Sequence, residues 1–309
     1  MKTVCINTSS FAVHSDEPLK ILREKKYEIE FNTTGRKLNQ NELCNLIKMS
    51  DGVIAGTEKY TRDILARLPY LKVISRLGIG MDNVDLKAVD ENGIKVFKTK
   101  TNPAPAVAEL VLGLMIDVVR NISKSSYDLK KGEWKKHMGS LLQGTTLGII
   151  GLGNIGKTLV KLVRGFGFKV IAYDLFQDKD FMKEYDITYC ALNKLMQDSD
   201  IISLHLSLSD KTLKLINQDR LALMKKDAIL INTSRGEIID EQAVYDSLKS
   251  NKLAGAGLDV FAQEPYAGPL TELDNVVVTP HIGAYAKEIR TQMEIEATNN
   301  LIRGLKEND

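Results

Sequence analysis

The chain has 309 residues, enough for about two domains that each bury a hydrophobic core. Its residues are 43% hydrophobic and 27% charged and its net charge is +2, a balance typical of globular proteins. A charge so near zero gives no electrostatic reason to expect binding to nucleic acid or to a membrane surface.

Signals for export, membrane insertion and metal binding are not found in the sequence. The amino-terminal residues MKTVCINTSS lack the apolar run of a signal peptide, and the longest apolar stretch, AELVLGLMIDVVR, contains Glu109 and Asp117 and is too short to span a bilayer. Cys5, Cys44 and Cys190 are far apart, which fits reduced thiols and predicts a cytoplasmic protein. The cysteines and four histidines show no zinc-ligand spacing, so we expect no metal site.

The first hundred residues alternate between β-rich and helix-forming segments. The β-rich segments are KTVCIN, YEIEF, GVIAG, KVISR and KVFKT. This rhythm predicts a small parallel sheet with helices on its faces.

The segment TNPAPAVAELVLGLMIDVVRNI follows and predicts a long helix. Pro103 and Pro105 suit its beginning, and Val107, Leu110 and Val111 have helical spacing. Apolar residues also occupy other faces, so the helix is expected to be buried widely. A core helix and an interface with a second subunit are equally compatible with this pattern.

A second βα rhythm begins at Thr145. Seven further segments predict strands, and several are the continuous apolar runs of strands buried on both faces: TTLGII, KVIAY, ITYC, DIISLHL, AILINT, AGAGLDV and NVVVTP. The last segment, residues 284–309, predicts one helix with a polar face.

The strongest local motif joins the first two of these strands. An apolar strand leads into Gly151-Leu-Gly153-Asn-Ile-Gly156, then a helix, then the strand KVIAY and Asp174. Gly151 permits a tight turn, Gly153 lets the backbone approach a pyrophosphate and Gly156 allows close helix–strand packing. The helix amino end suits an anion, so the motif predicts dinucleotide binding.

Asp174 favours NAD over NADP. It stands where a carboxylate can accept hydrogen bonds from both ribose hydroxyls, and it would repel a 2′-phosphate. The next residues, Leu175 and Phe176, supply no arginine to compensate.

Three loops that follow later strands carry residues able to do chemistry. Arg235 in NTSRG could bind a carboxylate or form a surface salt bridge, and Glu264 before Pro265 could be a solvated acid. His281, between Pro280 and Gly283, can lie neither within a helix nor within a strand. At one edge of one parallel sheet, an anion-binding Arg, an acid and a proton-transferring His suit hydride transfer to a carbonyl. His205, also at a strand end, is expected to be structural or close to the cofactor.

These segments together resemble the D-isomer-specific 2-hydroxyacid dehydrogenases, in particular phosphoglycerate dehydrogenase-like members. The segments that carry the resemblance are VISRLGIGMDNVDLKAVDENGIKVF, AVAELVLGLM, GEWKKHMGSLLQGTTLGIIGLGNIG, NTSRGEIIDEQAV, GAGLDVFAQEP and VTPHIGAYAKE. They span nearly the whole chain in the family's order.

The resemblance implies roles for individual residues. Arg235 would bind the substrate carboxylate and carbonyl, His281 would be the acid/base, and Glu264 would hydrogen-bond His281. The glycine motif and Asp174 would bind NAD together with Asn154, Ile155, Leu206, Thr233, Ser234, Gly283 and Asp259, the last at the nicotinamide carboxamide. The loop from Arg76 to Gly80, including Ile79, would hold the substrate carboxylate, and Arg76 resembles the arginine that reaches a phosphate. The usual NTP turn is replaced by KTKTNPAP, where Asn102 takes the corresponding place.

The resemblance also implies the fold and the assembly. It predicts two Rossmann/flavodoxin-like doubly wound parallel-sheet domains with a cleft between them. Residues 1–101 plus 285–309 would form the substrate domain and residues 102–284 the NAD-binding domain. Members are usually homodimers built on the long helix predicted in residues 101–122.

The sequence thus predicts an NAD-dependent oxidoreductase that interconverts a small anionic D-2-hydroxy acid, 3-phosphoglycerate-like, and its 2-oxo acid. A glyoxylate or hydroxypyruvate reductase is the nearest alternative. An NAD-sensing corepressor-like scaffold is an alternative of another class, distinguished by whether 2-oxo acids oxidise NADH.

Overall fold

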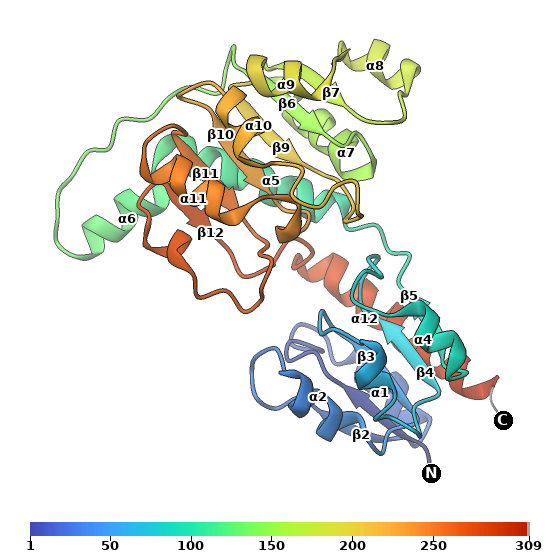
Figure 1. Ribbon diagram of the computed structural model, residues 1–309. Coiled ribbons are helices and arrows are strands. Elements are labelled where there is room, and N and C mark those ends of the chain that lie inside the picture. Colours follow the sequence, from blue (N-terminus) through green and yellow to red (C-terminus); the bar gives the residue numbers. More distant parts are fainter. Residues whose placement is uncertain (308–309) are drawn as a thin grey trace. The chain divides into compact units, whose positions relative to one another are not determined.

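The computed structural model describes residues 1–307 and divides them into two compact units (Figure 1). The first unit combines Met1–Asn102 with the segment from Tyr285 onward, and the second is Pro103–Ala284. Each unit is built around its own parallel sheet with helices on both faces.

The sheet of the first unit has five strands, each within one of the five predicted segments. Their order is β2-β1-β3-β4-β5 and every neighbouring pair is parallel. This is the flavodoxin-like order, whose ligand-binding switch point lies between β1 and β3. The strands are β1 (Thr3–Ile6), β2 (Glu28–Phe31), β3 (Gly52–Ala55), β4 (Val73–Arg76) and β5 (Lys95–Lys98).

The helices of the first unit form two layers. The core of one face is supplied by α2 (Gln40–Ile47), α3 (Arg62–Leu65) and α4 (Leu86–Glu91). On the other face α12 (Lys287–Lys306) packs against β3, β4 and β5, with α1 (Glu17–Glu24) beside it. The final helix therefore begins three residues later than the predicted segment, and Asn308 and Asp309 lie outside the described residues.

The sheet of the second unit has seven strands, and all seven predicted segments contain one. The order is β12-β11-β10-β9-β6-β7-β8, which is the Rossmann order with one strand added, and every pair is parallel. The strands are β6 (Thr146–Ile150), β7 (Lys169–Tyr173), β8 (Thr188–Tyr189), β9 (Ile201–Leu204), β10 (Ile229–Asn232), β11 (Gly255–Leu258) and β12 (Val276–Val278).

The long helix α5 (Ala104–Arg120) is a core helix of this unit. It packs against β10, β11 and α7, and the side chain of Leu114 lies against Gly257, which has no side chain of its own. The opposite face of the sheet is covered by α9, α10 and α11. The remaining helices are α7 (Asn154–Val163), α8 (Lys179–Tyr185), α9 (Leu192–Asp198), α10 (Gln218–Leu223) and α11 (Glu241–Lys249).

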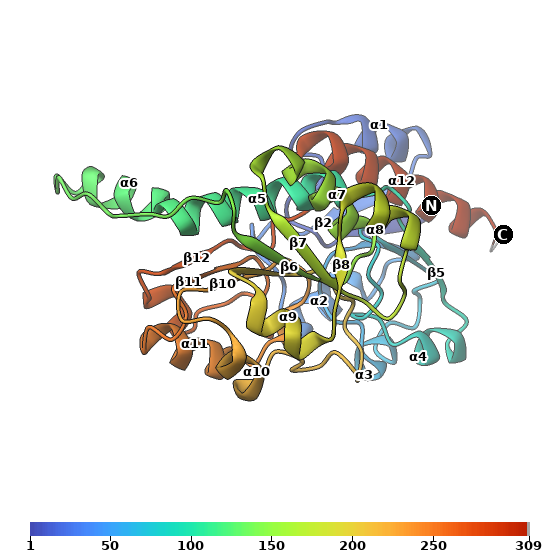
Figure 2. The same ribbon diagram turned by 90° about the horizontal axis from the view of Figure 1, so that it is seen from above.

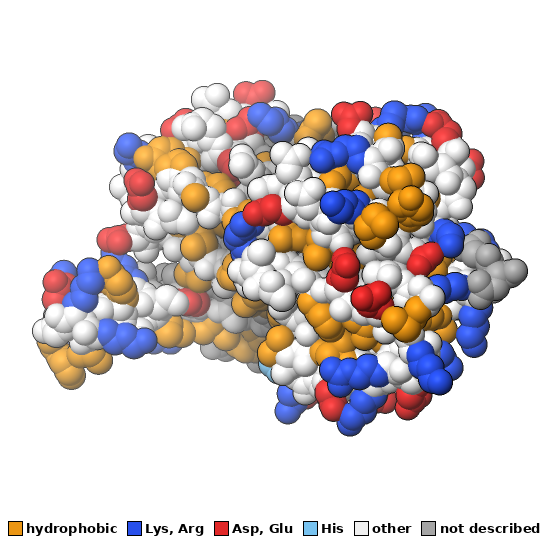
Figure 3. All heavy atoms as spheres, turned by 90° about the horizontal axis from the view of Figure 1, so that it is seen from below, with side chains coloured by type: hydrophobic (Ala, Val, Ile, Leu, Met, Phe, Trp, Pro, Cys, Tyr) orange, Lys and Arg blue, Asp and Glu red, His pale blue; other side chains and the backbone are white. Residues whose placement is uncertain are grey.

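A projecting arm follows α5 (Figure 2). Asn121 adopts a left-handed conformation with φ of 52°, which ends α5 and turns the chain into α6 (Ile122–Lys130). His137 Nε2 lies 2.7 Å from Asp128 Oδ2, and this contact holds the irregular segment after α6 against that helix. The arm exposes several large apolar side chains (Figure 3): Ile122, Tyr127, Leu129, Trp134, Met138 and Leu141.

Candidate active site

The glycine motif forms the turn from β6 into α7, and each glycine meets a different steric demand. Gly151 has φ of 98°, and a methyl group added to it would lie 2.7 Å from the carbonyl oxygen of His205. A methyl group on Gly156 would lie 2.4 Å from the carbonyl oxygen of Gly151. Gly153, at the amino end of α7, has no atom within 4 Å of that position. The backbone is thus open at the point where a pyrophosphate would approach the helix dipole.

Asp174 lies directly after β7 and is tied to the same turn. Its Oδ2 accepts a hydrogen bond of 2.7 Å from the backbone N–H of Leu152, and its Oδ1 accepts one of 2.9 Å from Phe176. Leu175 and Phe176 beside it are exposed. The other predicted cofactor residues follow strand ends of this sheet: Asn154 and Ile155 begin α7, Leu206 follows β9, and Thr233 and Ser234 follow β10.

His281 and Glu264 form a hydrogen-bonded pair. The imidazole Nδ1 lies 3.0 Å from both Oε1 and Oε2 of Glu264. A carboxylate only accepts hydrogen bonds, so Nδ1 carries the proton and Nε2 is the ring nitrogen left to exchange one. Glu264 Oε1 also accepts from the backbone N–H of Phe261 at 3.3 Å, which fixes the carboxylate.

Asp259, at the end of β11, builds the loop that holds His281. Its Oδ1 accepts from Thr279 Oγ1 at 2.6 Å and from the backbone N–H of Ile282 at 2.8 Å, and its Oδ2 accepts from Gly283 at 2.9 Å. Its carbonyl oxygen accepts from the N–H of His281 at 2.8 Å. His281 has φ of 57°, a left-handed conformation that costs a non-glycine residue about 1–3 kcal/mol and clusters at functional sites. Burial raises the pKa of Asp259. The sequence reasoning placed Asp259 at the cofactor and missed this role in the loop.

Arg235 lies in the loop after β10, next to the loop of Glu264. A methyl group on Gly236 would lie 1.9 Å from the carbonyl carbon of Phe261, so the two backbones are in contact there. Arg235 Nη1 donates to the carbonyl oxygen of Ser234 at 2.7 Å. The loops of Arg235, Glu264 and His281 thus follow the neighbouring strands β10, β11 and β12 at one edge of the sheet.

The predicted substrate residues Arg76, Ile79, Gly80 and Asn102 belong to the first unit. Arg76 ends β4, Ile79 is exposed in the loop that follows, and Asn102 lies between β5 and α5. Their role as substrate contacts stays a prediction.

Comparison with known proteins places the chain in a family. Residues 112–283 match the sequence model described as "D-isomer specific 2-hydroxyacid dehydrogenase, NAD binding domain". The chain belongs to this family. Its cofactor is NAD, and the open backbone at Gly153 and the carboxylate of Asp174 fit that dinucleotide.

Relatives in the family differ in the substrate that their names give. A hydroxypyruvate reductase of Thermotoga maritima is 40% identical over 96% of this chain and 98% of its own length. A D-3-phosphoglycerate dehydrogenase of Methanocaldococcus jannaschii is 42% identical over 88% of this chain, which spans 52% of that protein. The crystal structure of the TT0316 protein of Thermus thermophilus superposes with a TM-score of 0.87 and 32% identity, over 99% of this chain and 97% of that one.

His205 is a further feature of the NAD-binding unit. Its Nε2 lies 2.9 Å from Ser203 Oγ, and its Nδ1 is shielded from solvent without a hydrogen-bond partner among the described residues. Burial lowers the pKa of His205 to about 4, so the ring is neutral at pH 7. The backbone carbonyl oxygen of His205 lies beside Gly151 of the glycine motif.

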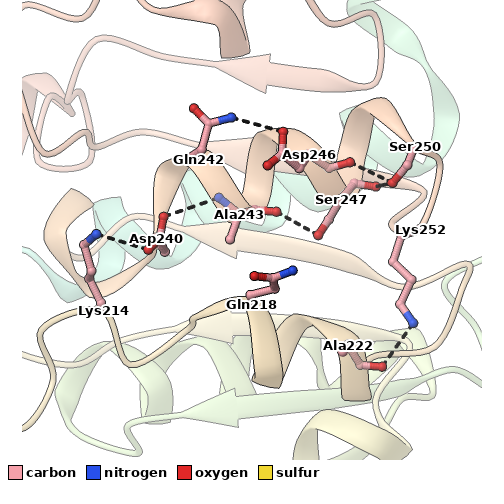
Figure 4. A pocket seen from close by; sticks show the side chains of 10 residues that line it. All are labelled: Lys214, Gln218, Ala222, Asp240, Gln242, Ala243, Asp246, Ser247, Ser250 and Lys252. Atoms are coloured by element: carbon pink, nitrogen blue, oxygen red, sulfur yellow. Dashed lines mark hydrogen bonds and ion pairs between the residues drawn. The ribbon is translucent and has the colours of Figure 1, made fainter.

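A polar hollow lies between α10 and α11 (Figure 4), on elements that carry none of the predicted site residues. Lys214 Nζ is 3.1 Å from Asp240 Oδ2, and Lys252 Nζ donates to the carbonyl oxygen of Ala222 at 3.0 Å. Both lysines thus have hydrogen-bond partners among the residues that line the hollow. Within residues 1–307 no group of three His, Cys, Asp or Glu side chains could hold a metal, and no helix is long and apolar enough to cross a membrane.

Proposed function

We propose that the protein interconverts a D-2-hydroxy acid and its 2-oxo acid, with His281 as the group that exchanges the proton. The observation that carries this is the bond of Nδ1 to both oxygens of Glu264, which leaves Nε2 as the ring nitrogen that can exchange a proton. NAD, when bound, supplies the hydride donor or acceptor. In reduction, Nε2 gives its proton to the substrate oxygen, and Glu264 stabilises the imidazolium form that starts the step. In oxidation, the neutral Nε2 takes the hydroxyl proton.

Arg235 is proposed to bind the substrate carboxylate and to offset negative charge on the oxygen that receives the proton. A guanidinium presents two parallel N–H donors, which match a carboxylate or adjacent oxygens. Preorganised donors of this kind contribute a few kcal/mol to the transition state. Residues 1–101 plus 285–309 are proposed as the substrate domain and residues 102–284 as the NAD-binding domain, which differ from the two compact units only in the assignment of Asn102.

The variant His281→Ala tests this assignment. Loss of a general acid/base lowers turnover by about 10³-fold, while NADH affinity, measured by fluorescence titration, should change little because the pyrophosphate and ribose contacts lie elsewhere. Glu264→Gln keeps the shape of the side chain and one hydrogen-bond acceptor for His281. It is therefore expected to lower turnover less than His281→Ala does. Near-normal turnover in His281→Ala would contradict the assignment.

Two substrate classes are supported by different observations. Arg76 at the carboxyl end of β4 supports a phosphorylated acid such as 3-phosphoglycerate, as does the Methanocaldococcus relative. The Thermotoga relative, which this chain covers almost end to end, supports hydroxypyruvate, with glyoxylate as the smaller homologue. Assays of 3-phosphoglycerate, 2-hydroxyglutarate, hydroxypyruvate and glyoxylate side by side separate these classes.

The projecting arm supports a homodimer. Trp134 is 80% exposed and Leu141 is 72% exposed on a segment that also carries α6. Large apolar side chains gathered on one segment are typical of an association surface. Trp134→Glu with Leu141→Glu should yield monomers in analytical ultracentrifugation, whereas Tyr70→Glu, an exposed apolar residue of the other unit, should leave the mass unchanged. A monomeric wild type would contradict the proposal.

A cytoplasmic location is proposed from the cysteines. Cys5 and Cys44 are buried and unpaired, and Cys190 is also a free thiol. Free thiols of this kind suit a reducing compartment, and cell fractionation tests the location directly.

A further inference from the structure

The guanidinium of Arg76 is held on the inner side of its own loop. Its Nε donates to Asn83 Oδ1 at 2.9 Å, and its Nη1 donates to the carbonyl oxygens of Leu77 at 2.8 Å and Ala55 at 3.2 Å. A methyl group on Gly78, which has φ of 153°, would lie 3.1–3.3 Å from the guanidinium atoms. The guanidinium therefore lies directly beneath the backbone of Gly78.

Asn83 completes this anchorage at the other end of the loop. Its Nδ2 donates to the carbonyl oxygens of Glu58 at 2.7 Å and Gly56 at 3.2 Å, and its own carbonyl oxygen accepts from Tyr60 at 2.7 Å. Arg76 and Asn83 thus tie the loop 77–83 to the segment that follows β3. Between the two anchors the loop exposes Ile79 and the adjacent glycine backbone, where a substrate carboxylate is expected.

A buried acid lies beneath the same edge of the sheet. Glu58 is 4% exposed, and its Oε2 accepts from Asn7 Nδ2 at 2.9 Å. Asn7 Oδ1 in turn accepts from the N–H of Gly56 at 2.7 Å, which joins the ends of β1 and β3 at the switch point. Burial raises the pKa of Glu58, and the charge of Arg76 opposes that effect.

The second guanidinium at this edge, that of Arg290, is matched as well. Its Nε donates to Glu294 Oε1 at 2.8 Å, and both side chains are buried. Its Nη2 donates to the hydroxyls of Thr8 at 3.2 Å and Ser10 at 3.1 Å. The loops after β1 and β4, residues 7–16 and 77–85, contain no lysine or arginine, whereas the loop after β3 contains Lys59, which is exposed. The two guanidinium groups described at this edge therefore serve the fold.

We infer that Arg76 is a positioning residue for the loop 77–83 and does not itself bind the substrate. The inference rests on the proposed dehydrogenase function and concerns how the loop proposed to hold the substrate is anchored. It replaces the expectation that Arg76 reaches a substrate phosphate.

The test measures NADH-dependent reduction of glyoxylate, hydroxypyruvate and 3-phosphohydroxypyruvate by the wild type, Arg76→Gln, Arg76→Lys and Asn83→Ala. Arg76→Gln should lower kcat/KM for all three acids by a similar factor, about 10- to 100-fold, because the loop loses its anchor. Arg76→Lys should recover part of that loss. Asn83→Ala is the matched control, because it removes the other anchor without removing a charge and should reproduce the effect of Arg76→Gln.

The ratio between phosphorylated and unphosphorylated acids decides the outcome. A ratio that changes by less than about 3-fold across the variants supports a positioning role. A selective loss of at least about 100-fold for 3-phosphohydroxypyruvate in Arg76→Gln, with an unchanged ratio in Asn83→Ala, would overturn the inference alone. No NADH oxidation with any 2-oxo acid would overturn the proposed function and the inference with it.

Discussion

The loop of His281 should depend on Asp259 more than on any other side chain, and Asp259→Asn tests this. The carboxylate is 1% exposed and accepts three hydrogen bonds from the loop. Asparagine can keep the two bonds at Oδ1, but its NH₂ group would face the N–H of Gly283. A buried donor without an acceptor costs about 1–3 kcal/mol and a lost bond to a charged group about 1.5–3 kcal/mol.

These opposing contributions determine the expected magnitude. Burial raises the pKa of Asp259, so removing the charge recovers part of its desolvation cost. The net loss in the free energy of unfolding is therefore expected near the lower end, about 2 kcal/mol. Because the left-handed conformation of His281 also depends on this loop, turnover should fall by about 10²-fold. Urea unfolding and steady-state kinetics measure the two effects.

A cofactor role for Asp259 would give a different result. Thr279→Val removes one neutral donor to the same carboxylate and should cost about 1 kcal/mol, with a smaller loss of turnover. If Asp259 acts only as a ligand of the nicotinamide carboxamide, Asp259→Asn would unfold like the wild type and bind NADH at least about 10-fold more weakly. Wild-type stability in that variant would refute the argument made from the loop.

Three further predictions concern the NAD-binding unit. Gly153→Val should change the free energy of unfolding by no more than about 0.5 kcal/mol, because there is space for a side chain at Gly153, but it should weaken NADH binding at least about 10-fold. Gly156→Val should destabilise the fold, because its side chain would clash with the backbone of Gly151. Asp174→Ser should raise the kcat/KM ratio of NADPH to NADH at least about 10-fold, because a carboxylate repels a 2′-phosphate. Burial lowers the pKa of His205 to about 4, below about 6.5 in the unfolded chain. The buried neutral ring therefore contributes fully to the free energy of unfolding above pH 6.5, and this contribution is lost as the pH falls through 4. Between pH 7 and pH 4 the free energy of unfolding, measured with urea, should fall by up to about 3 kcal/mol more in the wild type than in His205→Asn.

The fold could be predicted from the sequence because its signals are local. All twelve strands lie in β-rich segments, and the order strand, glycine turn, helix, strand, Asp174 is fixed within 29 consecutive residues, 146–174. In such a motif the strands and the helix on either side of the glycines can be read from the same stretch of sequence. The family resemblance added the residue roles, and the structure places Glu264 in contact with His281 as that resemblance implies.

What the sequence did not predict depends on hydrogen bonds between distant residues. Nothing near Asp259 indicates that its carboxylate accepts from Thr279, Ile282 and Gly283, twenty or more residues later. The left-handed backbone of His281 was not predicted either, because histidine is enriched in that conformation but most histidines have a negative φ. In each case the chemistry of the side chain was clear while its partner was not.

Arg76 shows how this limit bears on substrate choice. From the sequence, an arginine at the end of β4 is a cation at the ligand-binding edge of a doubly wound sheet, and a phosphate is the natural partner. In the structure the guanidinium donates three of its hydrogen bonds to Asn83 and to the carbonyl oxygens of Leu77 and Ala55. It therefore holds the loop in place. An arginine at this position of the sequence therefore does not indicate phosphate specificity by itself, because the groups to which the guanidinium donates decide its role.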